Sequence, residues 1–200
     1  MQRSKTQAKR ILDRFRPDLV VGTGGYASYP AVKQAAKRGI PTAVHESNAV
    51  PGLTTKMLSK VTDLVMVGFE ESRAHYSRPE RVIVTGTPVR GDFFQHTRQE
   101  ARRKLGMDDN RPLILSYWGS LGAEVMNRQM VDFIVKEYQE GVPCRHIHGA
   151  GRDFGWMKEE LLRRGVKLNS NGVEVREYIY DMPLVMAAAD LVLCRAGAST

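Results

Sequence analysis

Short apolar runs alternate with longer stretches of helical periodicity along almost the whole chain. The apolar runs predict strands at Leu19–Gly22, Thr42–His45, Leu64–Val67, Val82–Val84, Leu113–Tyr117, Cys144–His148, Val173–Val175 and Leu191–Cys194. The amphipathic stretches predict helices at Lys5–Phe15, Pro30–Arg38, Leu53–Ser59, Arg98–Leu105, Val125–Glu140, Met157–Arg164 and Met182–Ala188. Strands that alternate with helices form parallel sheets covered by helices on both faces. The pattern therefore predicts an α/β fold.

The alternation is interrupted once, near the middle of the chain. Thr85–Arg90 ends the first series irregularly, and a new series of helices and strands begins after Thr97. We therefore expect two Rossmann-like lobes, an N-terminal one at residues 1–90 and a C-terminal one at residues 91–200. Ligands in such folds bind outside the carboxyl ends of the strands, so we expect the functional residues there, in a cleft between the lobes.

Two of the predicted strands run directly into glycine clusters. These are Gly22-Thr23-Gly24-Gly25-Tyr26 in the first lobe and Gly119-Ser120-Leu121-Gly122-Ala123 in the second. Glycine lets backbone N–H groups approach a ligand closely, and a helix that begins just beyond such a turn directs its partial positive charge toward a bound phosphate. The two turns therefore predict two phosphate-bearing substrates.

The last residues begin a third unit of the same kind. The strand at Leu191–Cys194 leads into the turn Arg195–Ala198, and Ser199 and Thr200 are residue types that commonly cap a helix N-terminus. The first predicted strand likewise has no earlier strand from which to cross over. We therefore expect a fragment of a longer protein, with both sheets incomplete.

Several other polar residues follow predicted strands. His45, Glu46 and Asn48 come after one of them, where an imidazole and a carboxylate can perform acid–base chemistry or can brace the loop. Arg90 lies at the lobe junction, where its guanidinium can bind a diphosphate through two hydrogen bonds or form a surface ion pair. Tyr178–Met182 precedes the last helix. This segment either lines a base-binding pocket or packs against the start of the helix as a hydrophobic staple.

Cys144, His146 and His148 share one face of a predicted strand, as metal ligands can. Zinc sites normally take ligands from a second element as well, and nothing elsewhere in the sequence offers a matching cluster. We therefore expect no metal here. The sequence also lacks the Asp-x-Asp motif with which many nucleotide-sugar enzymes hold a metal ion, so no cofactor is expected.

Composition and charge narrow the class further. The chain has 200 residues, of which 42% are hydrophobic, and it has no apolar run near the length of a membrane helix. Its two cysteines favour reduced thiols and a cytoplasmic protein. The net charge of +8 has two interpretations. The basic side chains either cover solvated helix faces or attract anionic lipid headgroups or polyphosphate substrates. Nucleic acid is disfavoured, because no aromatic platform accompanies the charge.

The ordered motifs resemble those of the MurG family of bacterial glycosyltransferases. The resemblance covers essentially the whole chain and rests on Gly24–Ser28, His45–Gly52, Gly86–Arg90, Gly119–Ala123, Tyr178–Met182 and Ala189–Thr200. It implies a two-lobed GT-B enzyme that moves N-acetylglucosamine from UDP-GlcNAc to lipid I, giving lipid II for peptidoglycan. It also implies a peripheral protein on the cytoplasmic face of the cell membrane, with anionic inner-leaflet lipid as a partner.

The resemblance also implies roles for individual residues. By the resemblance, Asn48 corresponds to a residue that contacts the donor sugar. Arg90, Gly119 and Ser120 correspond to residues that contact the donor and its diphosphate. Ile179 corresponds to the residue whose backbone binds the uracil. Ala198, Ser199 and Thr200 correspond to the start of a donor-binding loop. Gly24, Gly25 and Tyr26 correspond to part of the surface that faces the acceptor. His45 and Glu46 are secondary candidates for assisting the acceptor, because the family's candidate base is a histidine in a preceding loop.

Three residues depart from the family pattern. Ser47 stands in place of Gln, Thr87 in place of Asn, and Trp118 in place of Gly, which is expected to put a bulky indole beside the phosphate turn. Two other interpretations stay open. One is another GT-B enzyme, such as a glycolipid synthase or a UDP-GlcNAc epimerase, and the other is an inactive nucleotide-sugar-binding fragment.

Overall fold

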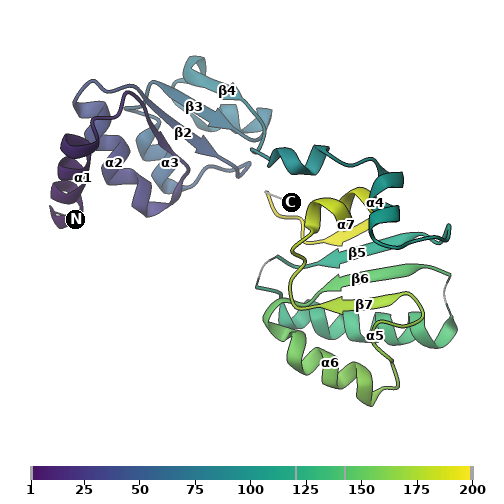
Figure 1. The fold of residues 1–200 in the computed structure, drawn as a ribbon. Coiled ribbons are helices and arrows are strands. Elements are labelled where there is room, and N and C mark those ends of the chain that lie inside the picture. Colours follow the sequence, from purple (N-terminus) through teal and green to yellow (C-terminus); the bar gives the residue numbers. More distant parts are fainter. Residues whose placement is uncertain (1, 120, 142, 199–200) are drawn as a thin grey trace. The chain divides into compact units, whose positions relative to one another are not determined.

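The structure is a computed structural model that describes residues 2–119, 121–141 and 143–198 (Figure 1). The chain divides into two compact units, one that runs up to Pro88 and one that spans Val89–Ala196. Within the described residues, each unit contains a four-stranded sheet in which all pairs of neighbouring strands are parallel. The predicted α/β fold with two parallel sheets is therefore confirmed.

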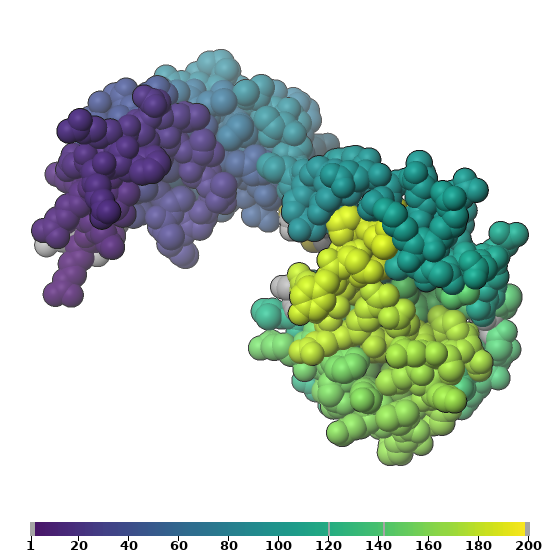
Figure 2. Space-filling model, in the orientation of Figure 1, coloured from purple at the N-terminus to yellow at the C-terminus, as the bar shows by residue number. Residues whose placement is uncertain are grey.

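The first unit has its strands in chain order. The strands are β1 (Val20–Gly22), β2 (Thr42–Glu46), β3 (Leu64–Val67) and β4 (Val82–Val84), and the helices are α1 (Gln2–Phe15), α2 (Gly25–Lys37) and α3 (Leu53–Leu58). The core joins α2 and α3 to the sheet through Val32, Val44, Leu58, Val65, Val67, Tyr76 and Val82. Helix α1 lies on the surface of this unit and buries only Ala8 and Leu12 among its described side chains (Figure 2).

The second unit has the strand order β7-β6-β5-β8. Its strands are β5 (Leu113–Tyr117), β6 (Arg145–Gly149), β7 (Val173–Arg176) and β8 (Leu191–Cys194), and its helices are α4 (Arg98–Lys104), α5 (Glu124–Glu140), α6 (Phe154–Arg163) and α7 (Met182–Ala188). Because the strand order reverses at β5, the carboxyl end of β5 is the switch point at which such sheets bind ligands.

Side chains alternate between the two faces of the second sheet. On one face, Trp118, Val173 and Val175 pack against α5 and α6 through residues such as Ile134 and Leu161. On the other face, a second cluster packs under α4 and α7, with members Ala101, Leu113, Leu115, Ile147, Val185 and Ala188. The sheet is therefore covered on both sides by helices (Figure 1).

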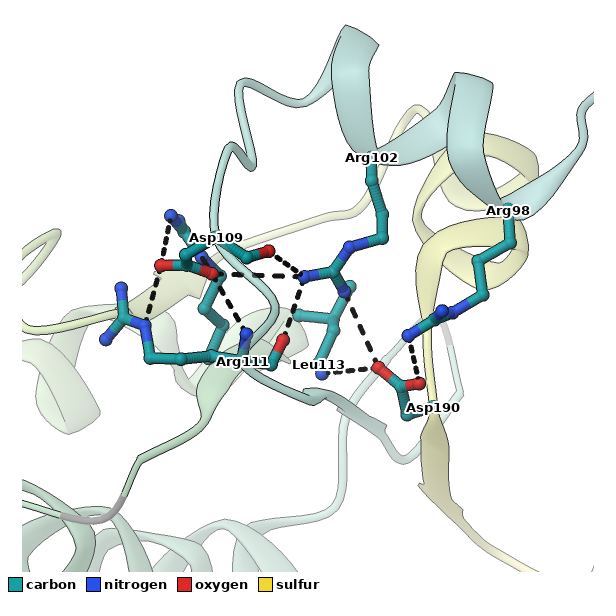
Figure 3. A network of polar contacts seen from close by, with 7 residues as sticks. Arg98, Arg102, Asp109, Arg111, Leu113 and Asp190 are labelled. Atoms are coloured by element: carbon teal, nitrogen blue, oxygen red, sulfur yellow. Dashed lines mark hydrogen bonds and ion pairs between the residues drawn. The ribbon is translucent and has the colours of Figure 1, made fainter.

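Ion pairs hold α4 against the amino edge of this sheet (Figure 3). Asp190, which directly precedes β8, pairs with Arg98 and Arg102 of α4 and accepts a hydrogen bond of 2.8 Å from the backbone N–H of Leu113. Hydrogen bonds from Arg145 and Arg111 hold the pKa of Asp109 well below its ordinary value. This network lies at the edge opposite the carboxyl ends, which it leaves free for a ligand.

Some element boundaries differ from the predicted ones. Helix α2 begins at Gly25, not at Pro30, because the glycine turn is shorter than expected and Pro30 is tolerated inside the helix at the loss of one backbone hydrogen bond. Strand β6 runs one residue later than predicted, so Cys144 lies outside it, and α6 begins at Phe154. Short 3-10 segments were not predicted at all, and they lie at Glu70–His75, Pro79–Arg81, Gly91–Phe94 and Gly151–Asp153.

Candidate functional site

Two glycine turns meet at the carboxyl edge of the second sheet. In the turn after β5, a Cβ atom on Gly122 would lie 2.4 Å from the carbonyl oxygen of Ala150, and a Cβ on Gly151 would lie 2.5 Å from the backbone nitrogen of Gly122. Both glycines also have positive φ angles, of 75° and 64°. The turns after β5 and β6 therefore touch through backbone alone, and α5 begins directly beyond them with its partial positive end at this edge.

Trp118 does not stand beside the phosphate turn as expected. Its side chain is only 4% exposed and packs with Met130 and Val131 of α5 in the core. Because successive residues of a strand point to opposite faces, the indole turns toward α5 while Tyr117 turns toward the cavity described next. The expectation of an indole crowding the turn is therefore wrong.

A cavity of about 300 Å³ opens above these turns within the second unit. It is lined by Arg90, Phe93, Tyr117, Gly119, Gly149, Gly151, Glu177, Tyr178, Ile179 and Met182. Three residues predicted from separate motifs, Arg90, Gly119 and Ile179, thus meet in one cavity. Ser120, which was predicted with them, lies outside the described residues.

The guanidinium of Arg90 is largely free to bind a ligand. Its side chain is 68% exposed, lies 5.5 Å from the centre of the Phe93 ring, and forms a long ion pair of 3.5 Å with Asp92. Such an exposed pair is weak, so both the ion pair and the predicted ligand contact are compatible with this geometry. The 3-10 segment that follows Arg90 packs on α7, which holds the residue at the cavity.

Ile179 forms part of the cavity wall with its side chain turned inward. The side chain is 5% exposed, and its Cδ1 lies 3.1 Å from the position of a Cβ on Gly149. Arg176 fixes the flanking segment through bonds of 2.7 Å to Glu174 and to Asp181. Because the side chain of Ile179 is apolar, only its backbone can form a hydrogen bond with a ligand in this cavity.

Arg195, which the sequence analysis did not single out, lies close to the glycine turn after β5. It follows β8, which pairs with β5, and its Nη2 lies 2.9 Å from the position of a Cβ on Gly119. A second guanidinium therefore lies at the glycine turn. Its place directly after a strand next to β5 was the signal that could have identified it. Ala198, which is half-buried, follows in an otherwise exposed loop, whereas Ser199 and Thr200 lie outside the described residues.

A second cavity, of about 280 Å³, lies in the first unit. It is lined by Thr23, Gly24, Gly25, Tyr26, Glu46, Ser47, Asn48, Gly52, Leu53, Thr54 and Thr55. It unites the predicted residues Gly24, Gly25 and Tyr26 with Glu46 and Asn48. The glycine turn after β1 and the loop after β2 thus form one cavity because β1 and β2 are parallel neighbours.

Glu46 is ionised and firmly hydrogen-bonded. It is 5% exposed, and it accepts bonds of 3.1 Å and 2.7 Å from the backbone and side chain of Asn48 and of 3.0 Å from the backbone of Gly52. Burial alone would raise the pKa of this carboxyl, but hydrogen bonds from Thr55, Gly52 and Asn48 outweigh burial and lower it. A lowered pKa makes Glu46 a weak proton acceptor, and the same bonds orient Asn48.

His45 is also engaged within the protein. It is 7% exposed, and its Nε2 donates a hydrogen bond of 2.9 Å to the carbonyl of Gly86. His45 does not line the cavity that holds Glu46 and Asn48. The catalytic role of either residue stays a prediction.

The set Cys144, His146 and His148 does not form a metal site. The two histidines are buried in a hydrogen-bond network with Ser116, and the thiol of Cys144 contacts Glu137. Across the part of the chain that the structure describes, no group of three His, Cys, Asp or Glu side chains is arranged to hold a metal ion. Both cysteines are free thiols.

Comparison with known protein families decides the family. Residues 2–67 match the glycosyltransferase family 28 N-terminal domain, and residues 114–200 match the glycosyltransferase family 28 C-terminal domain. Together the two matches cover well over half of the chain, one in each unit. The chain belongs to glycosyltransferase family 28. The two parallel α/β units of this family 28 chain are those of a GT-B fold.

Two of its curated relatives carry the same name. The family 28 chain is 41% identical over 97% of its length to the UDP-N-acetylglucosamine–N-acetylmuramyl-(pentapeptide) pyrophosphoryl-undecaprenol N-acetylglucosamine transferase of Thermoanaerobacter sp. (strain X514), and it covers 52% of that protein. It is 38% identical over 99% of its length to the transferase of the same name from Desulforamulus reducens, covering 54% of it. The chain thus spans about half the length of the relatives it matches.

Solved structures agree with the family. The MurG crystal structure from Acinetobacter baumannii matches 97% of the chain with a TM-score of 0.67 and 29% identity, and the chain covers 51% of it. UDP-GlcNAc 2-epimerase from Neisseria meningitidis bound to UDP-GlcNAc matches 98% of the chain with a TM-score of 0.61 but only 16% identity, and the chain covers 59% of it. The second likeness is one of fold alone.

Proposed function

We propose that the protein to which this family 28 chain contributes transfers N-acetylglucosamine from UDP-GlcNAc to lipid I, forming lipid II in peptidoglycan synthesis. The observation that carries the proposal is the cavity in the second unit. It joins Arg90, Gly119 and Ile179 at the carboxyl end of β5, beside the N-terminus of α5. The names of the relatives, and the identity of 29% to a MurG structure, support the choice of donor and acceptor.

The chemistry that fits this site is an inverting displacement. A hydroxyl of the acceptor sugar attacks the anomeric carbon, the new glycosidic bond forms as the bond to UDP breaks, and the hydroxyl proton passes to a base. The diphosphate of UDP then carries the leaving charge. Arg90, Arg195 and the positive end of α5 are the groups that stabilise this charge, since hydrogen bonds from guanidinium and backbone N–H groups to phosphate are strong.

The acceptor is assigned to the first unit. The cavity between Gly24, Gly25 and Tyr26 and the loop at Asn48 is the proposed place for the acceptor's sugar and diphosphate. Asn48 is proposed to contact the donor sugar; its side-chain nitrogen donates one hydrogen to Glu46, which leaves the amide oxygen and the second N–H available for that contact. We assign Glu46 to holding Asn48, and not to removing the hydroxyl proton, because its pKa is lowered.

Titration of the chain with UDP tests the donor site. Replacing Arg90 with Ala removes a charge-assisted hydrogen bond to phosphate, which is worth about 1.5–3 kcal/mol, and we expect UDP to bind about tenfold to hundredfold more weakly. Arg128→Ala is the matched control, because Arg128 is 67% exposed and does not line this cavity. Isothermal titration calorimetry gives both affinities. If the Arg90→Ala variant and the unmodified chain bind UDP with equal affinity, Arg90 does not contribute to the UDP site.

We further propose that the first unit binds the anionic cytoplasmic surface of the cell membrane. An apolar groove of about 770 Å³ runs between α1, α2 and α3, with Ile11, Leu53 and Met57 exposed along it. A basic groove adjoins it, lined by Lys5, Lys9, Gln34, Lys37, Arg38 and Thr6. No helix among the described residues has the length and apolar character needed to cross a membrane, so the proposed attachment is to the surface.

Vesicle sedimentation tests this attachment. We expect binding to vesicles rich in phosphatidylglycerol, little binding to phosphatidylcholine vesicles, and a loss of binding as salt rises, because surface charges are screened. The double variant Ile11→Gln with Met57→Gln should reduce binding. The control Leu162→Gln changes an exposed leucine of α6 in the other unit and should not. Salt-independent binding, or equal loss with the control, would contradict the proposal.

A further inference from the structure

A row of buried polar side chains runs through the core of the second unit behind the cavity. Glu137, His146, Ser116, His148 and Asn127 come from α5, β5 and β6, and each is at most 7% exposed. Each is joined to the next by a hydrogen bond of 2.6–3.0 Å. Five polar groups in a core are costly unless every donor meets an acceptor. The positions of the hydrogens can therefore be derived.

Asn127 stands at the end of the row nearest the cavity. One side-chain atom of Asn127 lies 2.8 Å from the carbonyl oxygen of Ala150 and 2.8 Å from a carboxylate oxygen of Asp153. Both partners only accept hydrogen bonds, so this atom is the amide nitrogen. The amide oxygen therefore faces Nε2 of His148 at 3.0 Å, and that nitrogen must carry a hydrogen.

The same reasoning extends to the other members of the row. Burial and the neighbouring His146 lower the pKa of His148 to about 3, so the ring is neutral and its Nδ1 accepts. Ser116 donates its one hydrogen to that Nδ1 at 2.7 Å, and its oxygen then accepts from Nε2 of His146 at 2.7 Å. Between Nδ1 of His146 and Glu137, 2.6 Å apart, a single proton remains. The three bonds from Nε2 of His146 through Ser116 and His148 to Asn127 thus each have one direction.

The row ends at the floor of the cavity. Asn127 binds Ala150, whose neighbours Gly149 and Gly151 line the cavity, and a Cβ on Gly122 would meet both Ala150 and Asn127, the latter at 3.3 Å. If His148 carried its hydrogen on Nδ1, two acceptors would face each other at Asn127. The amide would then rotate and leave the carbonyl of Ala150 without its donor.

We propose that His148 is a positioning residue, which acts through Asn127 to hold the glycine turn at Gly149–Gly151 in the shape that receives the diphosphate of UDP. The inference rests on the proposed function only in taking UDP as the ligand of this cavity. His148 touches no ligand itself, because it is completely buried.

Two isosteric variants of the full chain test the inference. In His148→Gln, the amide nitrogen of the glutamine reaches the place of Nε2, so this variant keeps the donor to Asn127. In His148→Asn, the amide nitrogen reaches only the place of Nδ1, so this variant loses that donor. We expect UDP to bind to His148→Gln within about twofold of the unmodified chain, and to His148→Asn about tenfold more weakly, the order expected for one lost hydrogen bond. Urea denaturation should show similar losses of stability in both. Equal UDP affinities of the two variants would overturn the inference.

Nuclear magnetic resonance separates this inference from the proposed function. If the unmodified chain does not bind UDP, the proposed function fails, and the inference is decided by the amide resonances of Gly149 and Gly151 without ligand. His148→Asn should shift these resonances and His148→Gln should leave them in place. If neither variant folds, the ¹⁵N shifts of His148 in the unmodified chain decide. A hydrogen on Nε2 supports the inference, and one on Nδ1 overturns it.

Discussion

At the scale of single residues, Gly122 is the position with the least room for change. Its φ angle is 75°, and a methyl group there would lie 2.4 Å from the carbonyl oxygen of Ala150. Gly141, at the end of α5, has a similar φ of 63° but nothing within 4 Å. The two glycines thus separate the cost of backbone conformation from the cost of a steric clash.

We predict that Gly141→Ala lowers the free energy of unfolding by about 1 kcal/mol, the cost of a left-handed conformation. Gly122→Ala adds the clash and should lower it by about 3 kcal/mol or more. Urea denaturation of the two variants measures both values. Equal losses would mean that the turns after β5 and β6 do not touch as described.

Glu46 gives a prediction about pH. Its pKa in the folded chain lies below the usual value of 4.5, so its stabilising hydrogen bonds are fully present above that pH and are lost as pH falls through the folded-state pKa. Glu46→Gln should therefore be less stable than the unmodified chain by about 1–3 kcal/mol near neutral pH, with a difference that shrinks in acid. The exposed Glu80→Gln is the control. A stability difference between Glu46→Gln and the unmodified chain that grows as pH falls would contradict a lowered pKa of Glu46.

Sequence reasoning identified single site residues where a motif combined glycine or charge with the end of a strand. Gly119 was found in this way, Arg90 by its place at the lobe junction and Ile179 through the family resemblance, and the three residues line one cavity. Trp118 was misjudged because a motif carries no information on which face of the sheet a side chain takes. Arg195 was missed because only tertiary packing brings its guanidinium to Gly119.

At the scale of elements, Asp190 connects α4 to the sheet. Asp190 pairs with Arg98 and Arg102, of which Arg102 is nearly buried, and also binds the start of β5. Asp190→Ala should lower the free energy of unfolding by about 1–3 kcal/mol, because it removes the pair with Arg98 and one partner of the nearly buried Arg102, whose bonds to the carbonyls of Asp109 and Arg111 remain. Asp132→Ala breaks an exposed pair with Arg164 and should cost less than about 1 kcal/mol. Thermal denaturation compares the two, and similar losses would refute a special role for Asp190.

The sequence located strands and helices well because the strands of both parallel sheets are short apolar runs. Their apolar runs stand out from the amphipathic helices, and β3, β4, β5 and β8 have the predicted bounds. The start of α2 was misplaced because glycine and proline both usually mark helix ends. Pro30 lies inside α2, where packing against α1, α3 and the sheet offsets the missing hydrogen bond.

At the scale of the whole molecule, the two units have separate cores and separate cavities. The cavity assigned to UDP is lined only by residues of the second unit, whereas Leu58 is buried in the core of the first. Leu58→Ala should lower the stability of its unit by about 2–5 kcal/mol and leave the affinity for UDP unchanged. Calorimetric titration at a temperature where the variant stays folded measures this. A weaker affinity would mean that the first unit contributes to UDP binding.

The inward turn of Trp118 has an optical consequence. The chain has two tryptophans, Trp118 and Trp156, and both belong to the second unit. Trp118 is shielded from water in the core under α5 and α6, and its ring centre lies 6.1 Å from that of His148. Intrinsic indole fluorescence will therefore report on the second unit alone, and the unfolding of that unit can be followed by its emission without any added dye.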